Sequence, residues 1–142
     1  MAIRNLGTKA AHADMDGAGE YSFVDVRTVE EYEAGHPEGS VNVPWAVPDP
    51  ATGQMAPNPD FLPTMQKHFG TDTRLYLSCA AGVRSMHACR ELEAAGYSDL
   101  CSVDGGFMGK RDPMGQLVHA GWVDSGLPVE HGPSRYHELR GA

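Results

Sequence analysis

The chain has 142 residues, of which 41% are apolar and 21% are charged, and its formal net charge at pH 7 is −8. This size and composition predict a single globular domain with one buried core. An acidic chain without a cluster of lysines or arginines is not typical of a nucleic-acid-binding protein. Because an acidic surface repels anions, any anionic ligand must bind at a site that is locally positive.

The three cysteines and seven histidines match no zinc motif, and no Cys-x-x-Cys pair is present. We therefore expect no bound metal. Residues 1–5 lack the apolar stretch of a signal peptide, and no apolar segment has the length of a membrane span. These features favour a cytoplasmic protein that makes no membrane contact and lies in a reducing compartment.

Periodicity and capping residues predict helices that alternate with short strands. Thr8 is placed to cap the first helix, and Thr28 with Glu31 matches a capping box. Asn58, followed by proline and aspartate, is typical of a third helix start. In chain order, we expect a helix at 8–15, a strand at 22–26, a helix at 28–35, a strand at 41–43, a loop at 45–57, a helix at 58–69, a strand at 74–78, a helix at 83–95 and a strand at 99–103.

The C-terminal third of the chain carries weaker signals. Residues 107–120 are expected to form an irregular, glycine-containing stretch, and residues 122–129 to close the domain. We place the domain at 8–130, with an N-terminal extension at 1–7 and a polar tail at 131–142.

Strands that alternate with helices predict an α/β fold with a mostly parallel central sheet and helices on both faces. In such folds ligands bind at the carboxyl ends of the strands. The predicted strands end at Arg27, at Cys79 and at Gly105-Gly106. We therefore expect these residues to meet at one edge of the sheet.

Cys79 lies between a short apolar strand and a helix, on a tight loop where free backbone N–H groups and the helix dipole favour negative charge. Such a position stabilises a thiolate and an anionic substrate group beside it. A buried structural cysteine is the alternative, but the glycine and arginine within the loop favour a nucleophile. The anion-binding loop is expected to comprise Ala80, Ala81, Gly82, Val83, Arg84 and Ser85.

The other two cysteines have structural interpretations. Cys89 falls on one helix face with Ser85, Ala88 and Leu92, at the spacing of a core-facing stripe. Cys101 alternates with its strand neighbours and points to the opposite face. We expect both thiols to be buried.

Taken together, these motifs resemble the rhodanese homology domain, in order, from about residue 8 to residue 130. The segment that begins at Asn58 looks like that of the single-domain rhodaneses of plants and bacteria. The matching residues are Val24-Asp25-Val26-Arg27 with Glu31-Tyr32, Gly35-His36-Pro37-Glu38-Gly39-Ser40-Val41-Asn42-Val43-Pro44, Cys79 to Ser85, Leu92 to Tyr97, Asp104-Gly105-Gly106-Phe107, and Trp122 to Val129.

The resemblance implies a sulfurtransferase that uses Cys79 as its nucleophile. The thiolate takes the sulfane sulfur of thiosulfate or a similar donor, and an acceptor such as cyanide or a thiol then removes it from the persulfide. No metal or organic cofactor is implied. The partners are thus a small-molecule donor and acceptor, with a protein acceptor as a further candidate and a monomer or homodimer as the assembly.

The resemblance also implies supporting residues around the loop. Arg84 has two interpretations, since its guanidinium either binds the sulfonate end of a donor or pairs with a carboxylate and braces the loop. Asp25 and Arg27 match an Asp-x-Arg pair behind the loop, and Gly105-Gly106 allows close backbone approach. Glu31 and His36 match positions that flank the site, although a solvated face or a turn explains them equally well.

Two further features leave alternatives open. Residues 107–121 exceed the short link usual in the family, and they form either a flap that brings Lys110, Arg111 and His119 over the pocket or a surface loop. The alternative functions are a non-turnover persulfide carrier or sulfide-binding module for a partner protein, a redox sensor, and a cysteine phosphatase or arsenate reductase. Phosphatase loops place five residues between cysteine and arginine, whereas four separate Cys79 from Arg84, and Ser78 stands where those loops usually carry histidine.

Overall fold

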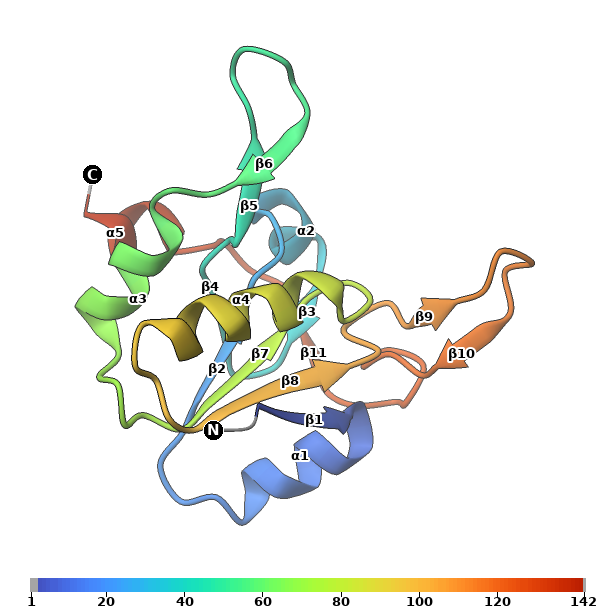
Figure 1. Cartoon of the computed structure of the whole chain (residues 1–142). Coiled ribbons are helices and arrows are strands. Elements are labelled where there is room, and N and C mark those ends of the chain that lie inside the picture. Colours follow the sequence, from blue (N-terminus) through green and yellow to red (C-terminus); the bar gives the residue numbers. More distant parts are fainter. Residues whose placement is uncertain (1–2, 142) are drawn as a thin grey trace.

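The computed structural model describes residues 3–141 and is built on a five-stranded sheet with strand order β1-β8-β7-β2-β4 (Figure 1). Every neighbouring pair in this sheet is parallel. The expected α/β fold with a parallel central sheet is therefore confirmed. The strands are β1 (Arg4–Gly7), β2 (Ser22–Asp25), β4 (Ser40–Asn42), β7 (Leu75–Ser78) and β8 (Leu100–Asp104).

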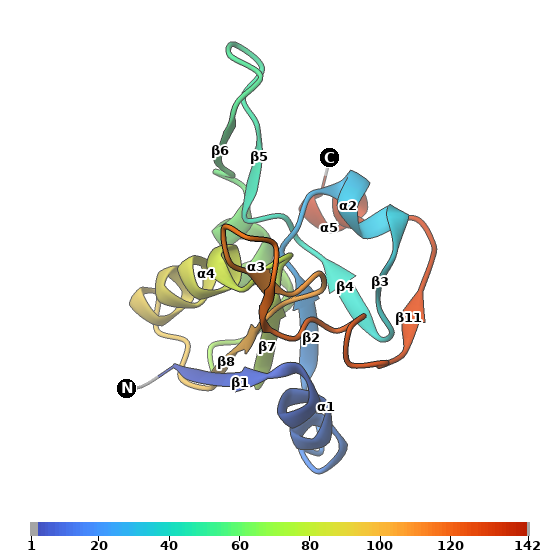
Figure 2. The ribbon, with the colours of Figure 1, turned by 90° about the vertical axis from the view of Figure 1, so that its right-hand side faces the viewer.

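Helices cover both faces of the sheet, as Figures 1 and 2 show. On β7, Leu75 and Leu77 pack into the cluster shared with the helices of one face, whereas Tyr76 packs with the helix of the other face. This alternation follows from the two-residue period of a strand that is buried on both sides. The helices are α1 (Thr8–Asp16), α2 (Val29–Ala34), α3 (Phe61–His68), α4 (Val83–Ala94) and α5 (Tyr136–Arg140).

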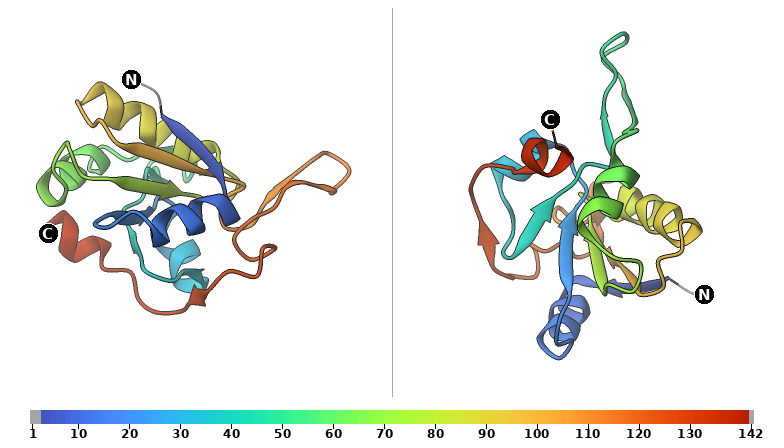
Figure 3. Two further views of the ribbon diagram at one scale, coloured as in Figure 1. Left: turned by 90° about the horizontal axis from the view of Figure 1, so that it is seen from below. Right: turned by 90° about the vertical axis from the view of Figure 1, so that its left-hand side faces the viewer.

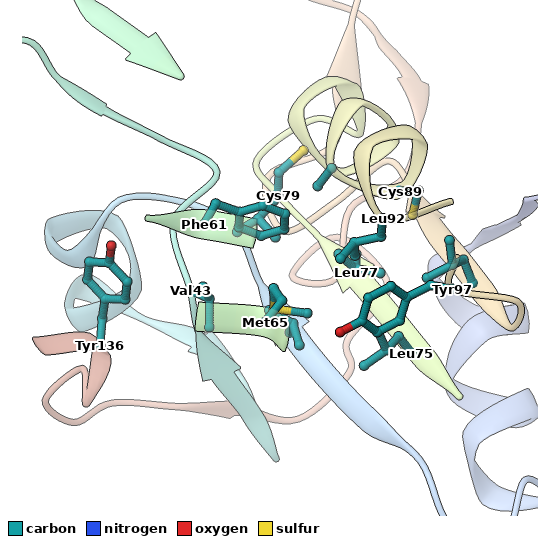
Figure 4. Packing of buried hydrophobic residues seen from close by; sticks show 14 residues of the cluster. Val43, Phe61, Met65, Leu75, Leu77, Cys79, Cys89, Leu92, Tyr97 and Tyr136 are labelled. Atoms are coloured by element: carbon teal, nitrogen blue, oxygen red, sulfur yellow. The ribbon is translucent and has the colours of Figure 1, made fainter. Parts of the chain in front are cut away.

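The larger core lies between the sheet and helices α3 and α4 (Figure 4). The expected stripe of α4 is confirmed, because its buried residues are Ser85, Ala88, Cys89 and Leu92. Cys101 lies in the other cluster, away from Leu100, as its strand position predicted.

Two segments expected to be irregular form antiparallel hairpins instead. The first comprises β5 (Ala46–Pro48) and β6 (Met55–Pro57), and the second comprises β9 (Lys110–Arg111) and β10 (Leu117–His119). Both extend from the body of the molecule (Figures 1 and 3). Composition alone did not reveal them because the pairing depends on the partner strand rather than on local propensity.

Both ends of the chain are more structured than expected. Residues 4–7, placed in an N-terminal extension, form the edge strand β1 and pair with β8. In the expected polar tail, α5 contacts α3, and Tyr136 is buried with its hydroxyl accepting a hydrogen bond from Asn58 Nδ2 at 2.8 Å. Near the tail, β11 (Val129–Glu130) pairs with β3 (His36–Pro37).

The helix starts agree with expectation only in part. Thr28 and Glu31 form the expected capping box of α2. Thr8 does not cap α1, because Gly7 holds that position and the Thr8 hydroxyl lies 2.7 Å from that of Ser125. Asn58 does not cap α3 either, because Asp60 holds the capping position. The side-chain oxygen of Asn58 instead accepts a hydrogen bond from the backbone N–H of Asp60.

Candidate active site

Cys79 follows β7 directly, and the loop after it folds around its sulfur. The backbone N–H groups of Gly82 and Ser85 donate to Sγ at 3.1 and 3.3 Å. The Ser85 hydroxyl lies 3.6 Å from the same atom. Two N–H donors together with the N-terminus of α4 make this a favourable position for negative charge on sulfur.

The loop requires glycine at position 82. Its φ of +102° lies in the left-handed region, and a Cβ there would come within 3.3 Å of the Gly105 nitrogen. Gly82 is also the residue that precedes α4 and that donates to Sγ. Its backbone freedom thus allows the chain to turn from the strand into the helix while its N–H faces the sulfur.

The segment that follows β8 is hydrogen-bonded to the cysteine loop, backbone to backbone. The N–H groups of Phe107 and Met108 donate to the carbonyls of Cys79 and Ala80 at 2.7 and 2.8 Å. A Cβ on Gly106 would lie only 2.3 Å from the Cys79 carbonyl oxygen. The expected close approach is therefore found at Gly106, whereas Gly105 packs against Ala120.

Arg84 forms a bidentate ion pair with Glu31, with Nη1 and Nη2 at 2.8 and 3.0 Å from the two carboxylate oxygens. Burial by itself raises the pKa of Glu31, but hydrogen bonds from Arg84 and Thr28 outweigh it and lower that pKa to about 2. Of the two interpretations of Arg84, the structure shows the contact with a carboxylate. Glu31 thereby joins α2 to the first turn of α4.

Asp25 and Arg27 form a buried pair beside the loop. The Arg27 guanidinium contacts the Asp25 carboxylate at 2.8 Å, donates to the Gly35 carbonyl at 2.7 Å and lies 4.3 Å from the centre of the Phe107 ring. Asp25 is the sheet neighbour of Ser78, the residue before Cys79. The pair therefore supports both the end of β7 and the segment that holds the Cys79 carbonyl.

His36 packs against α2 and does not contact the cysteine loop. Its ring is buried, stacks on the ring of Tyr32 at 3.6 Å and places Nδ1 2.8 Å from the Tyr32 carbonyl oxygen. Its other ring nitrogen lies 4.0 Å from Glu130 of β11. Neither a solvated face nor a turn describes this position, because the ring is buried and His36 lies on strand β3.

The two remaining cysteines are buried, as expected, and neither is in a disulfide. Burial raises the pKa of the Cys89 thiol to about 12 and also raises the pKa of Cys101. Both thiols are therefore poor nucleophiles, which weighs against either as a resolving partner for Cys79.

Of the three basic residues named in the long link at 107–121, Arg111 and His119 lie beside acidic side chains. Arg111 lies 3.3 Å from Asp124, and His119 lies 3.1 Å from Asp104. Figures 1 and 3 show its hairpin directed away from the body of the molecule. The direction of the hairpin, together with these two contacts, favours a surface hairpin over a flap that covers the pocket.

Two features near the loop had no clear sequence signal. The hydroxyl of Ser102 lies 2.8 Å from the Ser85 hydroxyl and positions that group beside Sγ. In the sequence, the only sign of Ser102 is that it is a polar residue in an otherwise apolar part of a strand. A hollow of about 460 Å³ lies beside Arg84, against the β5–β6 hairpin. Because that hairpin was expected to be a loop, the hollow was not foreseen.

Within residues 3–141, no three His, Cys, Asp or Glu side chains are grouped so as to hold a metal ion. Over the same residues, none of the helices combines the length and apolar character needed to span a membrane.

A family model described as a rhodanese-like domain matches residues 8–111. The chain belongs to this family. Among its relatives in Arabidopsis thaliana, rhodanese-like domain-containing protein 17 is 35% identical over 123 residues, which cover 84% of this chain and 70% of the relative. The chloroplastic thiosulfate sulfurtransferase 16 is 32% identical over 110 residues, covering 78% of this chain and 80% of the relative.

The rhodanese-like fold is also found in solved structures. The crystal structure of Rv0390 from M. tuberculosis superposes with a TM-score of 0.76 at 25% identity, covering 93% of this chain and all of that one. The resemblance expected from the motifs is therefore confirmed at the level of family and fold.

Proposed function

We propose that this rhodanese-like protein is a sulfurtransferase that moves a sulfane sulfur from thiosulfate, or a similar donor, to a thiophilic acceptor through a persulfide on Cys79. The observation that carries the proposal is the pair of N–H groups, from Gly82 and Ser85, that donate to Sγ. The family and a relative named thiosulfate sulfurtransferase support it.

In the donor step, the Cys79 thiolate attacks the outer sulfur of thiosulfate. A new S–S bond forms, and the original S–S bond breaks with its electron pair leaving on sulfite. The persulfide then carries its negative charge on the outer sulfur. The backbone of the loop would stabilise that charge and the departing oxyanion. The loop comprises Ala80, Ala81, Gly82, Val83, Arg84 and Ser85.

In the acceptor step, cyanide or a thiol attacks the outer sulfur of the persulfide. The Cys79 thiolate leaves, and the product is thiocyanate or a new persulfide. Donor and acceptor thus react in separate steps, so ping-pong kinetics are expected. The chemistry involves no metal and no organic cofactor. A cytoplasmic location and a monomeric or dimeric assembly stay predictions.

The supporting residues act through the loop rather than on the substrate. Glu31 holds Arg84 against the first turn of α4. Asp25 holds Arg27, whose guanidinium lies over the Phe107 ring, and the Phe107 N–H binds the Cys79 carbonyl. Each contact restricts the position of the loop amides, and preorganised donors are more effective than mobile ones.

The mass of the intact protein after incubation with thiosulfate tests the proposal. The wild type and Cys89→Ser should each gain one sulfur atom that cyanide removes, whereas Cys79→Ser should gain none. If Cys79→Ser also gains a sulfur atom, or if the mass of the wild type is unchanged with every sulfane donor, the role of Cys79 is contradicted.

A persulfide carrier is a second candidate, and one observation favours it. Val83 on the loop and Met108 beside it are 58% and 56% exposed, so apolar side chains near the cysteine are available for contact with a protein. A carrier would transfer its sulfur stoichiometrically to a protein thiol while turning over thiosulfate and cyanide negligibly. Rapid turnover with both small molecules would favour the enzyme instead.

A further inference from the structure

Ser102 carries a buried hydroxyl that the sulfur-transfer steps described above do not use. It lies on β8, the strand that pairs with β7, and 0% of it is exposed. Its neighbours Cys101 and Val103 pack into the apolar cluster of the opposite face. By the two-residue period of a strand, Ser102 faces the same side as Leu100, which packs in the cluster that includes α4. A hydroxyl in such a place costs free energy unless it is hydrogen-bonded, so its partner indicates what it does.

Among the described residues, the Ser102 hydroxyl has one hydrogen-bond partner, the Ser85 hydroxyl at 2.8 Å. Ser85 is also 0% exposed, so bulk water reaches neither oxygen. A buried O–H group donates to an acceptor where one is within reach. The Ser102 hydroxyl therefore donates to Ser85 Oγ, and the hydrogen of Ser85 is left for another acceptor.

The hydrogen of the Ser85 hydroxyl has two such acceptors. They are the Gly82 carbonyl oxygen at 3.2 Å and Cys79 Sγ at 3.6 Å. While the sulfur is protonated, its S–H donates to Ser85 Oγ, and the Ser85 hydrogen faces the Gly82 carbonyl. When the sulfur is a thiolate, rotation about one bond turns the Ser85 hydrogen towards it, because a hydrogen bond to a charged acceptor is stronger than one to a neutral acceptor.

The contact with Ser102 holds Ser85 Oγ in place in both states of the sulfur. It uses a lone pair of Ser85 Oγ and leaves the hydrogen of that oxygen free to turn. A hydroxyl that accepts a hydrogen bond is polarised and becomes a better donor in turn. The amides of Gly82 and Ser85 already donate to Sγ, so the hydroxyl adds a third donor, and its direction follows the charge on sulfur.

We propose that Ser102 is a positioning residue for Cys79, because its hydroxyl donates to Ser85 and thereby orients the Ser85 hydroxyl as a donor to the thiolate. The inference rests on the proposed function, in which this thiolate is the nucleophile of the donor step and the leaving group of the acceptor step. A donor to the thiolate favours both steps. The lower nucleophilicity of a stabilised thiolate offsets only part of the gain.

Alkylation with iodoacetamide, followed by intact mass, measures the thiolate without a sulfur donor. The thiolate attacks carbon, an S–C bond forms and iodide leaves. Ser102→Ala should slow this reaction at pH 7 about fivefold, the size of effect of one hydrogen bond, and should slow loading from thiosulfate similarly. Ser78→Ala is the matched control and should react at the wild-type rate. Ser78 is 1% exposed and adjoins Cys79, but its hydroxyl has no hydrogen-bond partner within residues 3–141.

A second pair of variants keeps the shape of the side chain and changes only the hydroxyl. Ser102→Thr should be alkylated about fivefold faster than Ser102→Val, which has the same shape and no hydroxyl. In the Ser85→Ala background, Ser102→Ala should have no further effect, because the two residues act through one contact. Equal rates for the threonine and valine variants, or full additivity with Ser85→Ala, would overturn this inference.

The two reactions also separate this inference from the proposed function. A wild type that is alkylated at Cys79 but takes no sulfur from any sulfane donor would overturn the proposed function. The alkylation rates of the Ser102 variants would still decide whether Ser102 acts on the thiolate. If the wild type is loaded with sulfur and Ser102→Ala matches it in both reactions, the inference about Ser102 fails alone.

Discussion

Glu31 and Arg84, 53 residues apart in the chain, join the start of α2 to the start of α4 through two hydrogen bonds of 2.8 and 3.0 Å. The same Glu31 carboxylate accepts from the backbone N–H of Thr28 at 3.1 Å and so completes the capping box. One side chain therefore sets the beginning of one helix and the direction of the arginine on the other. The position of the cysteine loop depends on both.

If Arg84 acts by bracing the loop, its loss and the loss of Glu31 should have the same effect. We expect Glu31→Gln and Arg84→Gln each to slow persulfide formation about tenfold, and the double variant to be no slower, because residues in one contact are not additive. The measurement is a double-mutant cycle on the donor step. An Arg84→Gln variant far slower than Glu31→Gln would instead show that the guanidinium binds the donor directly.

The Glu31 carboxylate should make folding stability depend on pH in the acid range. Its pKa is lowered from 4.5 to about 2 in the folded protein, so the unfolded chain binds the proton more readily. The resulting stabilisation is present above pH 4.5 and is lost as the pH falls from 4.5 towards 2. Urea unfolding of the wild type and Glu31→Gln at several pH values should show a difference in unfolding free energy that shrinks over this interval. Arg84→Gln removes hydrogen bonds that lower this pKa, so the folded-state pKa of Glu31 moves back towards its ordinary value, and the variant should lose less stability than the wild type as the pH falls over this interval.

Much of the fold followed from local patterns, and the parts that did not depend on distant contacts. Strand β7 is apolar in its first three residues, and the stripe on α4 has helical spacing, so both were expected. Strand β1 is only half-buried in an alternating pattern, and its extended structure depends on pairing with β8. Helix α5 has five residues, and it is stabilised by the burial of Tyr136 rather than by its own propensity.

The candidate site divides in the same way. The cysteine loop and the capping box are each formed by consecutive residues, so their residue types indicate the local backbone structure. The partner of Arg84 could not be predicted in this way, because a guanidinium can bind either a substrate or a carboxylate. Only the fold brings Glu31 within reach of it. The placement of His36 under α2 likewise depends on β11, which pairs with β3 from the other end of the chain.

Asp25 and Arg27 form a nearly fully buried ion pair, with 0% and 3% of each residue exposed. Removing the cation alone leaves a buried carboxylate without its partner. We expect Arg27→Met to lower the unfolding free energy by about 3–5 kcal/mol. Denaturant unfolding by circular dichroism measures the change.

The double variant Asp25→Asn, Arg27→Met removes the uncompensated charge together with the pair. It should therefore recover part of the stability lost in Arg27→Met. We expect both variants to form the persulfide more slowly than the wild type, because Phe107 loses its cation contact in each. A double variant less stable than Arg27→Met would be inconsistent with an electrostatic origin of the loss.

Gly106 has both a left-handed backbone and no room for a side chain. Its φ is +58°, and a Cβ would lie 2.3 Å from the Cys79 carbonyl oxygen and 2.8 Å from the Ala80 carbonyl carbon. Gly115, in the β9–β10 hairpin, also has a positive φ of +83° but meets nothing within 4 Å. The two positions thus separate backbone strain from steric exclusion.

Gly115→Ala should lose about 1–2 kcal/mol of unfolding free energy, the ordinary penalty of a left-handed residue. Gly106→Ala should lose about 2 kcal/mol more, because the overlap must be relieved by displacing well-packed backbone. It should also slow persulfide formation, since the displaced atoms belong to the cysteine loop, whereas Gly115→Ala should react at the wild-type rate. Equal stabilities and equal rates in the two variants would show that the loop does not depend on this close approach.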